Sequence, residues 1–586
     1  MWKIRAKGLL YICIFFFTLL LFRLMKIQLI NTENFSKHHI NLLEESVKQR
    51  TQELVIDNGR GSFLDRNGNM LTHKKESVLV LFPFLKKMDW DVEKVSSISG
   101  ISQESLQHAV EKAKKPFTYG NPEPVELTDS QVERINALEI PGVFAIDKKF
   151  ERKSLPAEQL IGLTGENPTE LVNRYPKKEL PRETLIGVSG LEKSFDEFLL
   201  PEGKSKLVYH VDGDGAPLFG INVKYVDPAN PFYPVNVKTT IDKTIQQKAE
   251  ELVDRYQIKK GGLVLLDIKD NSILAMVSRP NVNKKDPYSG SGITNRMLKQ
   301  QIMGSVFKTV VAAAAIDQNL DNPARVFDCS KKINGEPELK YDYGKLNFSE
   351  SFARSCNRTF GELSKELQKI DPTILEQYAS RLSLIGPVGW EGDVYHTSDF
   401  KQLGEEEKGR VFQSDNARKD SNYAAMSGIG QHEVRATPLA VANMMATIAR
   451  GGQKEMVRAV SKIQYKNGTT IVNFPQQNLP GDTISSYTAM KLQKLLRSVV
   501  QNPNGTGKWF QNLPYEVAGK SGTAETGKYL KGKQLHNKWF AGYFPYESPK
   551  YALVAVNFDV YDNEGGVNLL FSDMVKMLYS NNHLDE

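Results

Sequence analysis

The sequence is poor in cysteine and lacks the patterns that bind a metal or a nucleotide. Three cysteines occur in 586 residues, and none belongs to a Cys-x-x-Cys pair or a Cys/His cluster, so a zinc site is not expected. The chain also lacks a Gly-rich phosphate loop and internal repeats. Its formal net charge of +7 comes from 76 basic and 69 acidic residues dispersed along the chain, which does not predict binding to nucleic acid.

Cys329 and Cys356 leave two alternatives open. A disulfide between them is conceivable in an oxidising compartment, but two cysteines do not by themselves establish a pairing. We expect two unpaired thiols.

A single long apolar run occurs, and it lies at the N-terminus. Basic residues within 1–7 precede an uninterrupted apolar run over 8–22, and Arg23 and Lys26 interrupt its continuation to residue 30. The run is shorter than the roughly 20 residues that a bilayer requires. Basic side chains near a helix end can reach the interface, however, so 8–30 predicts a transmembrane anchor rather than a cleaved signal peptide. The basic residues predict a cytoplasmic tail over 1–7 and an external remainder.

The external part is predicted to form two domains. Over 31–235 the sequence mixes short strands, helices and turns, with a helix expected over 34–55 and a hairpin over 60–71. The segment 227–234 is rich in proline, which is typical of a linker.

The second domain is predicted to begin with a helix that Asp242 caps. A hairpin over 261–277 follows, by strand and turn composition. Helices and strands then alternate, and the last ones are expected at 538–544, 551–558 and 568–579.

The first candidate catalytic element is Ser305 with Lys308, which follow Gly304 and precede an apolar run. On a helix the serine and lysine lie one turn apart on one face. A serine becomes nucleophilic when a base removes its proton, and a lysine with a pKa lowered by burial can act as that base. The glycine is expected to let substrate approach the backbone. The Ser305 N–H would lie at the positive end of the helix, which suits an oxyanion.

The second candidate element is Ser355 with Asn357. The hydroxyl could relay a proton, and the amide could bind a substrate amide. Two look-alikes compete with these elements: a second Ser-x-x-Lys at 398–401 and a Ser-Asp-Asn at 414–416. The former lacks the glycine and the apolar helix, and the latter lies in a polar segment, so we expect both on the surface.

The third candidate element is the run of Lys520, Ser521, Gly522 and Thr523. A cation and hydroxyls on an edge strand can grip a peptide carboxylate, and the glycine leaves room for a substrate to lie alongside. The Thr523 N–H is the expected second oxyanion donor.

The three elements, in this order, resemble the motifs of the penicillin-binding protein and serine β-lactamase superfamily. Five further segments resemble motifs of class B penicillin-binding proteins: 60–68, 187–192, 262–280, 427–439 and 539–543. The sequence contains no Glu-Asp dipeptide, so the glycosyltransferase motif of the bifunctional class A proteins is absent. Departures are Cys356 in the second motif, His432 where a glycine is common, and Ser521 where many relatives have threonine.

The resemblance implies an α+β fold with a transmembrane helix over 8–30. An elongated mixed α/β pedestal of the dimerisation type would occupy 31–235. A transpeptidase domain would occupy 236–586, with a central antiparallel sheet flanked by helices and a helical subdomain.

The resemblance also implies a peptidoglycan D,D-transpeptidase of the bacterial cell membrane that works through a serine acyl-enzyme. Its partners would be stem peptides, β-lactams that acylate the same serine, and other cell-wall synthesis proteins such as a glycosyltransferase. No metal or organic cofactor is implied. The resemblance implies that Ser305 is the nucleophile, Lys308 the base and Ser355 the proton relay. It implies that Asn357 anchors the substrate. The carboxylate and oxyanion contacts would come from Lys520, Ser521, Gly522 and Thr523. A carboxypeptidase, a β-lactam hydrolase or sensor, and a non-catalytic scaffold remain alternatives.

Overall fold

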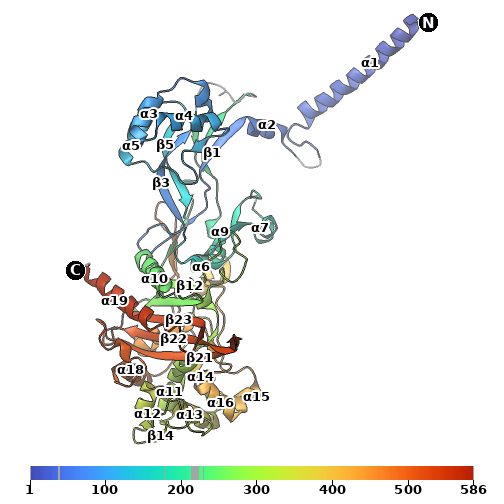
Figure 1. Cartoon of the computed structure of the whole chain (residues 1–586). Coiled ribbons are helices and arrows are strands. Elements are labelled where there is room, and N and C mark those ends of the chain that lie inside the picture. The colour runs from blue at the N-terminus through green and yellow to red at the C-terminus, as the bar shows by residue number, and fades with distance from the viewer. Residues whose placement is uncertain are drawn as a thin grey trace. The chain divides into compact units, whose positions relative to one another are not determined.

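The computed structural model describes residues 2–36, 40–152, 154–178, 180–212, 223–228 and 230–584. The chain packs as two compact units, each built from separated segments (Figure 1). The first unit consists of the segments Met1–Arg60, His73–Glu151 and Pro201–Tyr233. The second consists of the segments Gly61–Thr72, Arg152–Leu200 and Pro234–Glu586. Ala229, in the predicted linker, lies outside the described residues.

The segments 61–72 and 152–200, which the sequence assigned to the pedestal, pack with the second unit. For 61–72 the reason is strand pairing, since β2 (Ser62–Leu64) lies parallel to β10 (Asn236–Thr239) in one sheet. The segment 152–200 is joined to the second unit by hydrogen bonds such as that from the Ala157 N–H to Glu250 at 2.8 Å. The hairpin predicted over 60–71 is present in short form, since the Leu71 N–H donates to the carbonyl of Phe63 at 2.9 Å. A hairpin that the sequence assigned to the first domain therefore contributes a strand to a sheet of the second unit.

The N-terminus is a long apolar helix. Helix α1 (Trp2–Met25) continues as a π-helical turn, η1 (Lys26–Ile30), and the predicted anchor over 8–30 falls within them. The 24 residues of α1 extend about 36 Å at about 1.5 Å per residue. By length and composition this helix can cross a membrane, and none of its most apolar window is buried in the protein.

The helix predicted over 34–55 is confirmed only in its middle, because the described residues before Leu42 and those after Arg50 are not helical. Helix α2 spans Leu42–Arg50, and β1 (Thr51–Asp57) begins directly after it. Strand β1 pairs antiparallel with β8 (Ser205–His210), which pairs with β9 (Lys224–Val226). A partner about 150 residues away therefore overrides the local helical pattern. Residues 37–39 of the predicted helix lie outside the described part of the chain.

The rest of the first unit is built around β3 (His73–Leu81), which pairs with β5 (Val143–Glu151) and β4 (Phe117–Thr118). Side chains alternate along a strand, so Leu79 and Leu81 face one core cluster and Val78 and Val80 face another. The first cluster also contains side chains of α3 (Val92–Ser99), α4 (Gln103–Lys112) and α5 (Asp129–Asn136), which gather beside the sheet in Figure 1.

The second unit contains a five-stranded antiparallel sheet. Its strand order is β12 (Ser272–Arg279), β11 (Gly261–Asp267), β23 (Tyr551–Tyr561), β22 (Lys533–Phe544) and β21 (Ala518–Leu530). One face packs on α10 (Lys243–Arg255) and α19 (Asn568–Leu584). Helix α17 (Pro438–Ala449) packs across β11, β22 and β23, and α18 (Ser486–Gln501) lies along β21. Strand β21 is last in the strand order and is therefore an edge strand.

Several predicted elements are confirmed in this unit. Asp242 caps α10 by accepting hydrogen bonds from the N–H groups of Thr244 and Ile245. The hairpin over 261–277 is β11–β12, and the last two strands and last helix extend beyond their predicted limits. The predicted α+β fold is confirmed.

A helical subdomain carries the first two candidate catalytic elements. Its main helices are α11 (Lys308–Asp317), α12 (Phe348–Ala353), α13 (Asn357–Ile370), α14 (Ile374–Arg381) and α16 (Ser421–Gly428). Helix α11 is buried along nearly its whole length, because α13, α14 and α18 pack around it.

The remaining elements of the second unit are short. They are α6 (Glu158–Ile161), β6 (Thr164–Glu166), α7 (Pro168–Arg174), β7 (Leu185–Gly187), α8 (Gly190–Ser194), α9 (Asp196–Leu199), β13 (Gln301–Ile302), β14 (Val326–Asp328), β15 (Lys345–Asn347), β16 (Glu391–Val394), β17 (Thr397–Lys401), α15 (Asp415–Lys419), β18 (Arg435–Ala436), β19 (Val460–Gln464) and β20 (Thr470–Asn473).

Substitution of Phe571 on α19 tests the packing of the sheet. Its ring is fully buried, with centroids of Phe540 and Phe510 at 4.7 and 5.2 Å. Phe571→Ala should cost about 3–5 kcal/mol of stability, because it leaves a cavity in this cluster. Leu569→Ala on the same helix, where the side chain is 64% exposed, should leave the Tm nearly unchanged. Equal Tm values for the two variants, measured by thermal unfolding, would contradict this packing.

Candidate active site

Ser305 lies in a tight turn that leads into the buried helix α11. The turn is the 3₁₀ segment η4 (Gly304–Phe307). Gly304 has φ +56°, and a Cβ on it would lie 2.4 Å from the carbonyl oxygen of Thr523 on β21. The glycine is therefore needed because β21 passes directly against the turn, and not only because a substrate must approach, as the sequence suggested.

Lys308, the first residue of α11, is fully buried beneath this turn. Its Nζ lies 2.6 Å from the carbonyl oxygen of Ser355, 2.7 Å from Oδ1 of Asn357 and 3.1 Å from Oγ of Ser355. Burial lowers the pKa of the Lys308 ammonium well below its ordinary value, and the neighbouring charge of Lys520 lowers it further. The first two candidate elements therefore meet at one amine.

Lys520 on β21 is the second buried cation of the site. Its Nζ donates to Oγ of Ser355 at 3.0 Å and to the carbonyl oxygen of Ser521 at 3.2 Å. Burial lowers the pKa of Lys520 to about 7. The hydroxyl of Ser355 thus lies within hydrogen-bond distance of two lysines that come from different elements.

Two buried amines beside one hydroxyl favour a state in which only one of the two is protonated. Lys308 carries both the burial and the like-charge effect, whereas Lys520 carries the burial effect alone, so we expect Lys308 to lose its proton first. A neutral amine has two hydrogens and a lone pair. The two hydrogens would serve the oxygens of Ser355 and Asn357, and the lone pair would accept from the Ser355 hydroxyl. This arrangement would make Lys308 a base and Lys520 a cation.

The third element lines the site along the edge strand. The Ser521 hydroxyl donates to Oγ1 of Thr506 at 2.8 Å. The Glu525 N–H donates to the side chain of Gln431 at 3.2 Å and so points away from β22. Backbone groups two residues apart in a strand point the same way, so the N–H of Thr523 also faces the open side, towards Ser305. A Cβ on Gly522 would lie 2.7 Å from the carbonyl oxygen of Met303, which explains the glycine at this position.

These residues surround a cavity of about 410 Å³. Five of the eight predicted site residues line it: Ser305, Ser355, Asn357, Ser521 and Thr523. Lys308 and Lys520 are fully buried, and Gly522 packs on the turn. The structure thus brings together all three elements that the sequence selected.

The two look-alike motifs lie elsewhere. Ser398 is an exposed residue of β17, and Ser414 caps the exposed helix α15 by accepting from the N–H of Ala417. The polar segment predicted around Ser414 is therefore a helix start. His432 has φ +57°, a conformation that favours glycine, and its ring lies tilted against that of Tyr423, with centroids 5.6 Å apart.

The expectation of two unpaired thiols is wrong. Cys329 and Cys356 form a disulfide, with Cα atoms 6.0 Å apart and both sulfurs beside the cavity. Thr506 was also missed, because it lies in a glycine-containing turn that no motif marks. Its contact with Ser521 comes from tertiary packing. Neither feature has a local pattern by which the sequence could have revealed it.

The fold and the site define a class of protein by one arrangement: a serine and a buried lysine lie beside the edge strand of an antiparallel sheet. Residues 261–568 match the penicillin binding protein transpeptidase domain, and residues 55–230 match the penicillin-binding protein dimerisation domain. The chain belongs to the penicillin-binding protein family. The predicted family is thereby confirmed.

Several curated relatives are similar over about half of the chain. The peptidoglycan D,D-transpeptidase MrdA of Haemophilus influenzae is 26% identical over 370 residues, which cover 56% of this chain and 54% of that protein. The peptidoglycan D,D-transpeptidase PbpA of Mycobacterium tuberculosis is 25% identical over 354 residues, or 55% of this chain and 67% of that protein. The chain thus spans little more than half the length of MrdA.

Solved structures are similar over nearly the whole chain. A chain of a peptidoglycan synthase complex, described as coordinating polymerization and crosslinking, is superposed with a TM-score of 0.65 at 21% identity and covers 98% of this chain and 97% of that one. Penicillin binding protein 2X from Streptococcus thermophilus gives a TM-score of 0.63 at 18% identity, covering 91% and 80%. These likenesses establish the fold.

Replacement of Gly304 tests the contact between the turn and β21. Gly304→Ala should lower the Tm more than Gly468→Ala, because the new Cβ would overlap the carbonyl of Thr523. Gly468 also has a positive φ, +87°, but an added Cβ there meets nothing within 4 Å. It therefore isolates the backbone strain, about 1–2 kcal/mol. Thermal unfolding of both variants is the measurement, and an equal loss of Tm would contradict the close approach.

Proposed function

We propose that the chain is a peptidoglycan D,D-transpeptidase, in which Ser305 forms an acyl-enzyme with a stem peptide. The observation that supports this most strongly is the position of Ser305 on the same cavity as Ser355, whose hydroxyl lies 3.1 Å from Nζ of Lys308 and 3.0 Å from Nζ of Lys520. A nucleophile, a base and a fixed cation are the groups that acyl transfer from an anionic peptide requires.

In the proposed acylation step, Oγ of Ser305 attacks the carbonyl carbon of the penultimate D-alanine. Its proton passes to the Ser355 hydroxyl, which gives its own proton to the neutral amine of Lys308. The developing oxyanion is stabilised by the N–H groups of Ser305 and Thr523. Lys520 and Ser521 hold the terminal carboxylate. The amide bond then breaks, and D-alanine leaves with a proton relayed from Lys308 through Ser355.

In the proposed transfer step, an amine of a neighbouring stem attacks the ester carbonyl of the acyl-enzyme. The attacking amine loses one proton to Lys308 through the Ser355 hydroxyl. As the ester bond to Ser305 breaks, this proton passes back to Oγ of Ser305 and restores the free serine. Asn357 keeps its amide NH₂ for the substrate, because its Oδ1 accepts from Lys308. A β-lactam would acylate Ser305 by the first step alone and remain attached.

We propose further that the Trp2–Ile30 helix anchors the protein in the bacterial cell membrane as a single pass, with the catalytic unit on the extracytoplasmic side. The substrate lies outside the cytoplasm, and the basic residues before the apolar run support this orientation. Cross-linking needs polymerised glycan strands, so a glycosyltransferase is the expected partner.

Mass spectrometry after treatment with benzylpenicillin tests the nucleophile. The intact protein should gain the mass of one antibiotic, and the modified peptide should contain Ser305. Ser305→Ala should abolish the adduct, whereas Ser398→Ala, which removes the serine of the exposed look-alike, should retain it. An adduct that persists in Ser305→Ala would contradict the assignment.

The lifetime of the same adduct separates transfer from hydrolysis. A transpeptidase should hold the penicilloyl group for many turnover times. Rapid release of the hydrolysed antibiotic would favour the hydrolase alternative and contradict the proposed function.

The pH dependence of penicillin acylation tests the division of charge between the lysines. The second-order rate constant should rise with pH as Lys308 loses its proton and becomes a base. It should fall above pH about 7, as Lys520 loses the charge that attracts the carboxylate. Lys520→Arg keeps its charge at high pH, so the fall should disappear, whereas the exposed Lys528→Arg on the same strand should retain it. An unchanged fall in Lys520→Arg would contradict this role.

A further inference from the structure

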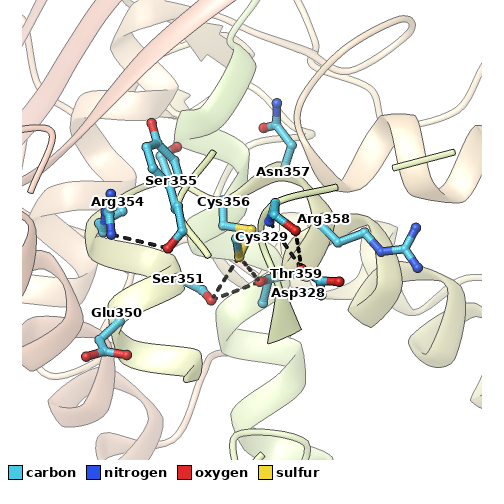
Figure 2. Close-up of a disulfide and its surroundings, with 12 residues drawn as sticks. Asp328, Cys329, Glu350, Ser351, Arg354, Ser355, Cys356, Asn357, Arg358 and Thr359 are labelled. Carbon is cyan, nitrogen blue, oxygen red and sulfur yellow. Dashed lines mark hydrogen bonds between the residues drawn. A yellow bond between two sulfur atoms is a disulfide. The ribbon is translucent and has the colours of Figure 1, made fainter. Parts of the chain in front are cut away.

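The disulfide of the described chain lies inside the candidate active site (Figure 2). Cys356 stands between Ser355 and Asn357 and is bonded to Cys329, 27 positions earlier. Both cysteines line the cavity that holds Ser305, although they are only 3% and 2% exposed. A covalent link therefore ends within the second catalytic element.

The turn that carries this element has a demanding conformation. Ser355 has φ +63°, a region that residues with a Cβ occupy only when their surroundings hold them there. The Ser355 N–H donates to the carbonyl of Phe352 at 3.2 Å, and the Cys356 N–H donates to that of Ser351 at 2.9 Å. Two hydrogen bonds to α12 and the disulfide thus hold a short, strained connection between α12 and α13.

The other end of the disulfide lies beside the hairpin β14–β15, whose second strand leads directly into α12. Cys329 follows β14, which pairs with β15. Its N–H donates to the carbonyl of Gly344 at 2.7 Å, and its carbonyl accepts from the N–H of Tyr343 at 3.2 Å. The Thr359 hydroxyl lies 3.4 Å from its sulfur and donates to Oγ of Ser351 at 2.9 Å. The sulfur bridge therefore adds a covalent link between this hairpin region and the turn before α13, which are also joined by hydrogen bonds from Arg358 on α13 to the carbonyls of Lys332 and Ile333 at 3.2 and 2.9 Å.

The three polar contacts described for the Lys308 amine all go to the residues that flank Cys356. We propose that the Cys329–Cys356 disulfide is a positioning element of the active site, which holds Ser355 and Asn357 against Lys308 and makes acylation of Ser305 depend on the oxidation state of the pair. The proposal rests on the proposed function, since acylation is its readout.

The chemistry of the switch is thiol–disulfide exchange with a dithiol. A thiolate of the dithiol attacks one sulfur of the pair, and the other cysteine leaves as a thiolate that takes up a proton. The second thiol of the reagent, as its thiolate, then displaces the first cysteine, which is also protonated. The protein gains two electrons and two protons, and the dithiol becomes a disulfide.

Dithiothreitol is the probe, and the full chain in detergent is the sample. After treatment and removal of the reagent, acylation by benzylpenicillin at pH 7 should be about 10- to 100-fold slower, the range expected when a catalytic group shifts by about 1 Å. Reoxidation should restore the rate. Cys13→Ser, which removes the free cysteine outside the site, should respond like the unmodified chain. The Cys329→Ser/Cys356→Ser double variant should be slow from the start and insensitive to dithiothreitol.

The pH profile distinguishes positioning from simple stabilisation. A loosened turn admits water to Lys308, so the pKa of its amine should move back towards the ordinary lysine range. The rising limb of the acylation profile should then shift to higher pH in the reduced protein and in the double variant. A change in stability alone would leave this limb where it is.

Three results would overturn the proposal: equal rates and profiles for the oxidised and reduced proteins, a loss of acylation that only parallels a loss of the folded state in thermal unfolding, or a double variant with unaltered rate. Absence of acylation in the oxidised protein is a different outcome, because it would refute the proposed function itself.

Discussion

The site depends on the burial of two lysines around one serine hydroxyl. Lys308 and Lys520 are both fully buried, and each lies within hydrogen-bond distance of Oγ of Ser355. Burial disfavours an ammonium group, and a second ammonium nearby disfavours it further. Burial and the neighbouring charge therefore favour a neutral amine at Lys308, and a neutral amine can act as the proposed base. The same burial thus supports the proposed chemistry.

The rest of the second unit can be understood as support for this cluster. Lys520 lies on the edge strand of the five-stranded sheet, and Lys308 lies on the buried helix α11. The turn before α13 delivers Ser355, and the disulfide ties that turn to the hairpin β14–β15. Gly304 lets the edge strand approach the turn that holds the candidate nucleophile. The residues of the cluster therefore come from different parts of the sequence.

Much of this could be predicted from the sequence, because motifs and caps are local. The Ser-x-x-Lys pair and the cap at Asp242 follow from residue type and spacing, and the apolar helix after Lys308 distinguished this candidate pair from that at 398–401. The start of β1 could not be predicted, since its partner strand lies about 150 residues away. The disulfide and the contact of Thr506 with Ser521 were hidden for the same reason: both are made by tertiary packing and leave no local pattern.

The protonation state of the two buried lysines is the central claim, and nuclear magnetic resonance can measure it directly. In protein labelled with ¹³C at the lysine ε position, the resonances can be assigned by single Lys308→Arg and Lys520→Arg variants and followed with pH. Two resonances should titrate below the ordinary lysine range, with that of Lys520 near pH 7 and that of Lys308 lower. If every lysine titrates near its ordinary value of about 10.4, neither amine is neutral at physiological pH and the account is contradicted.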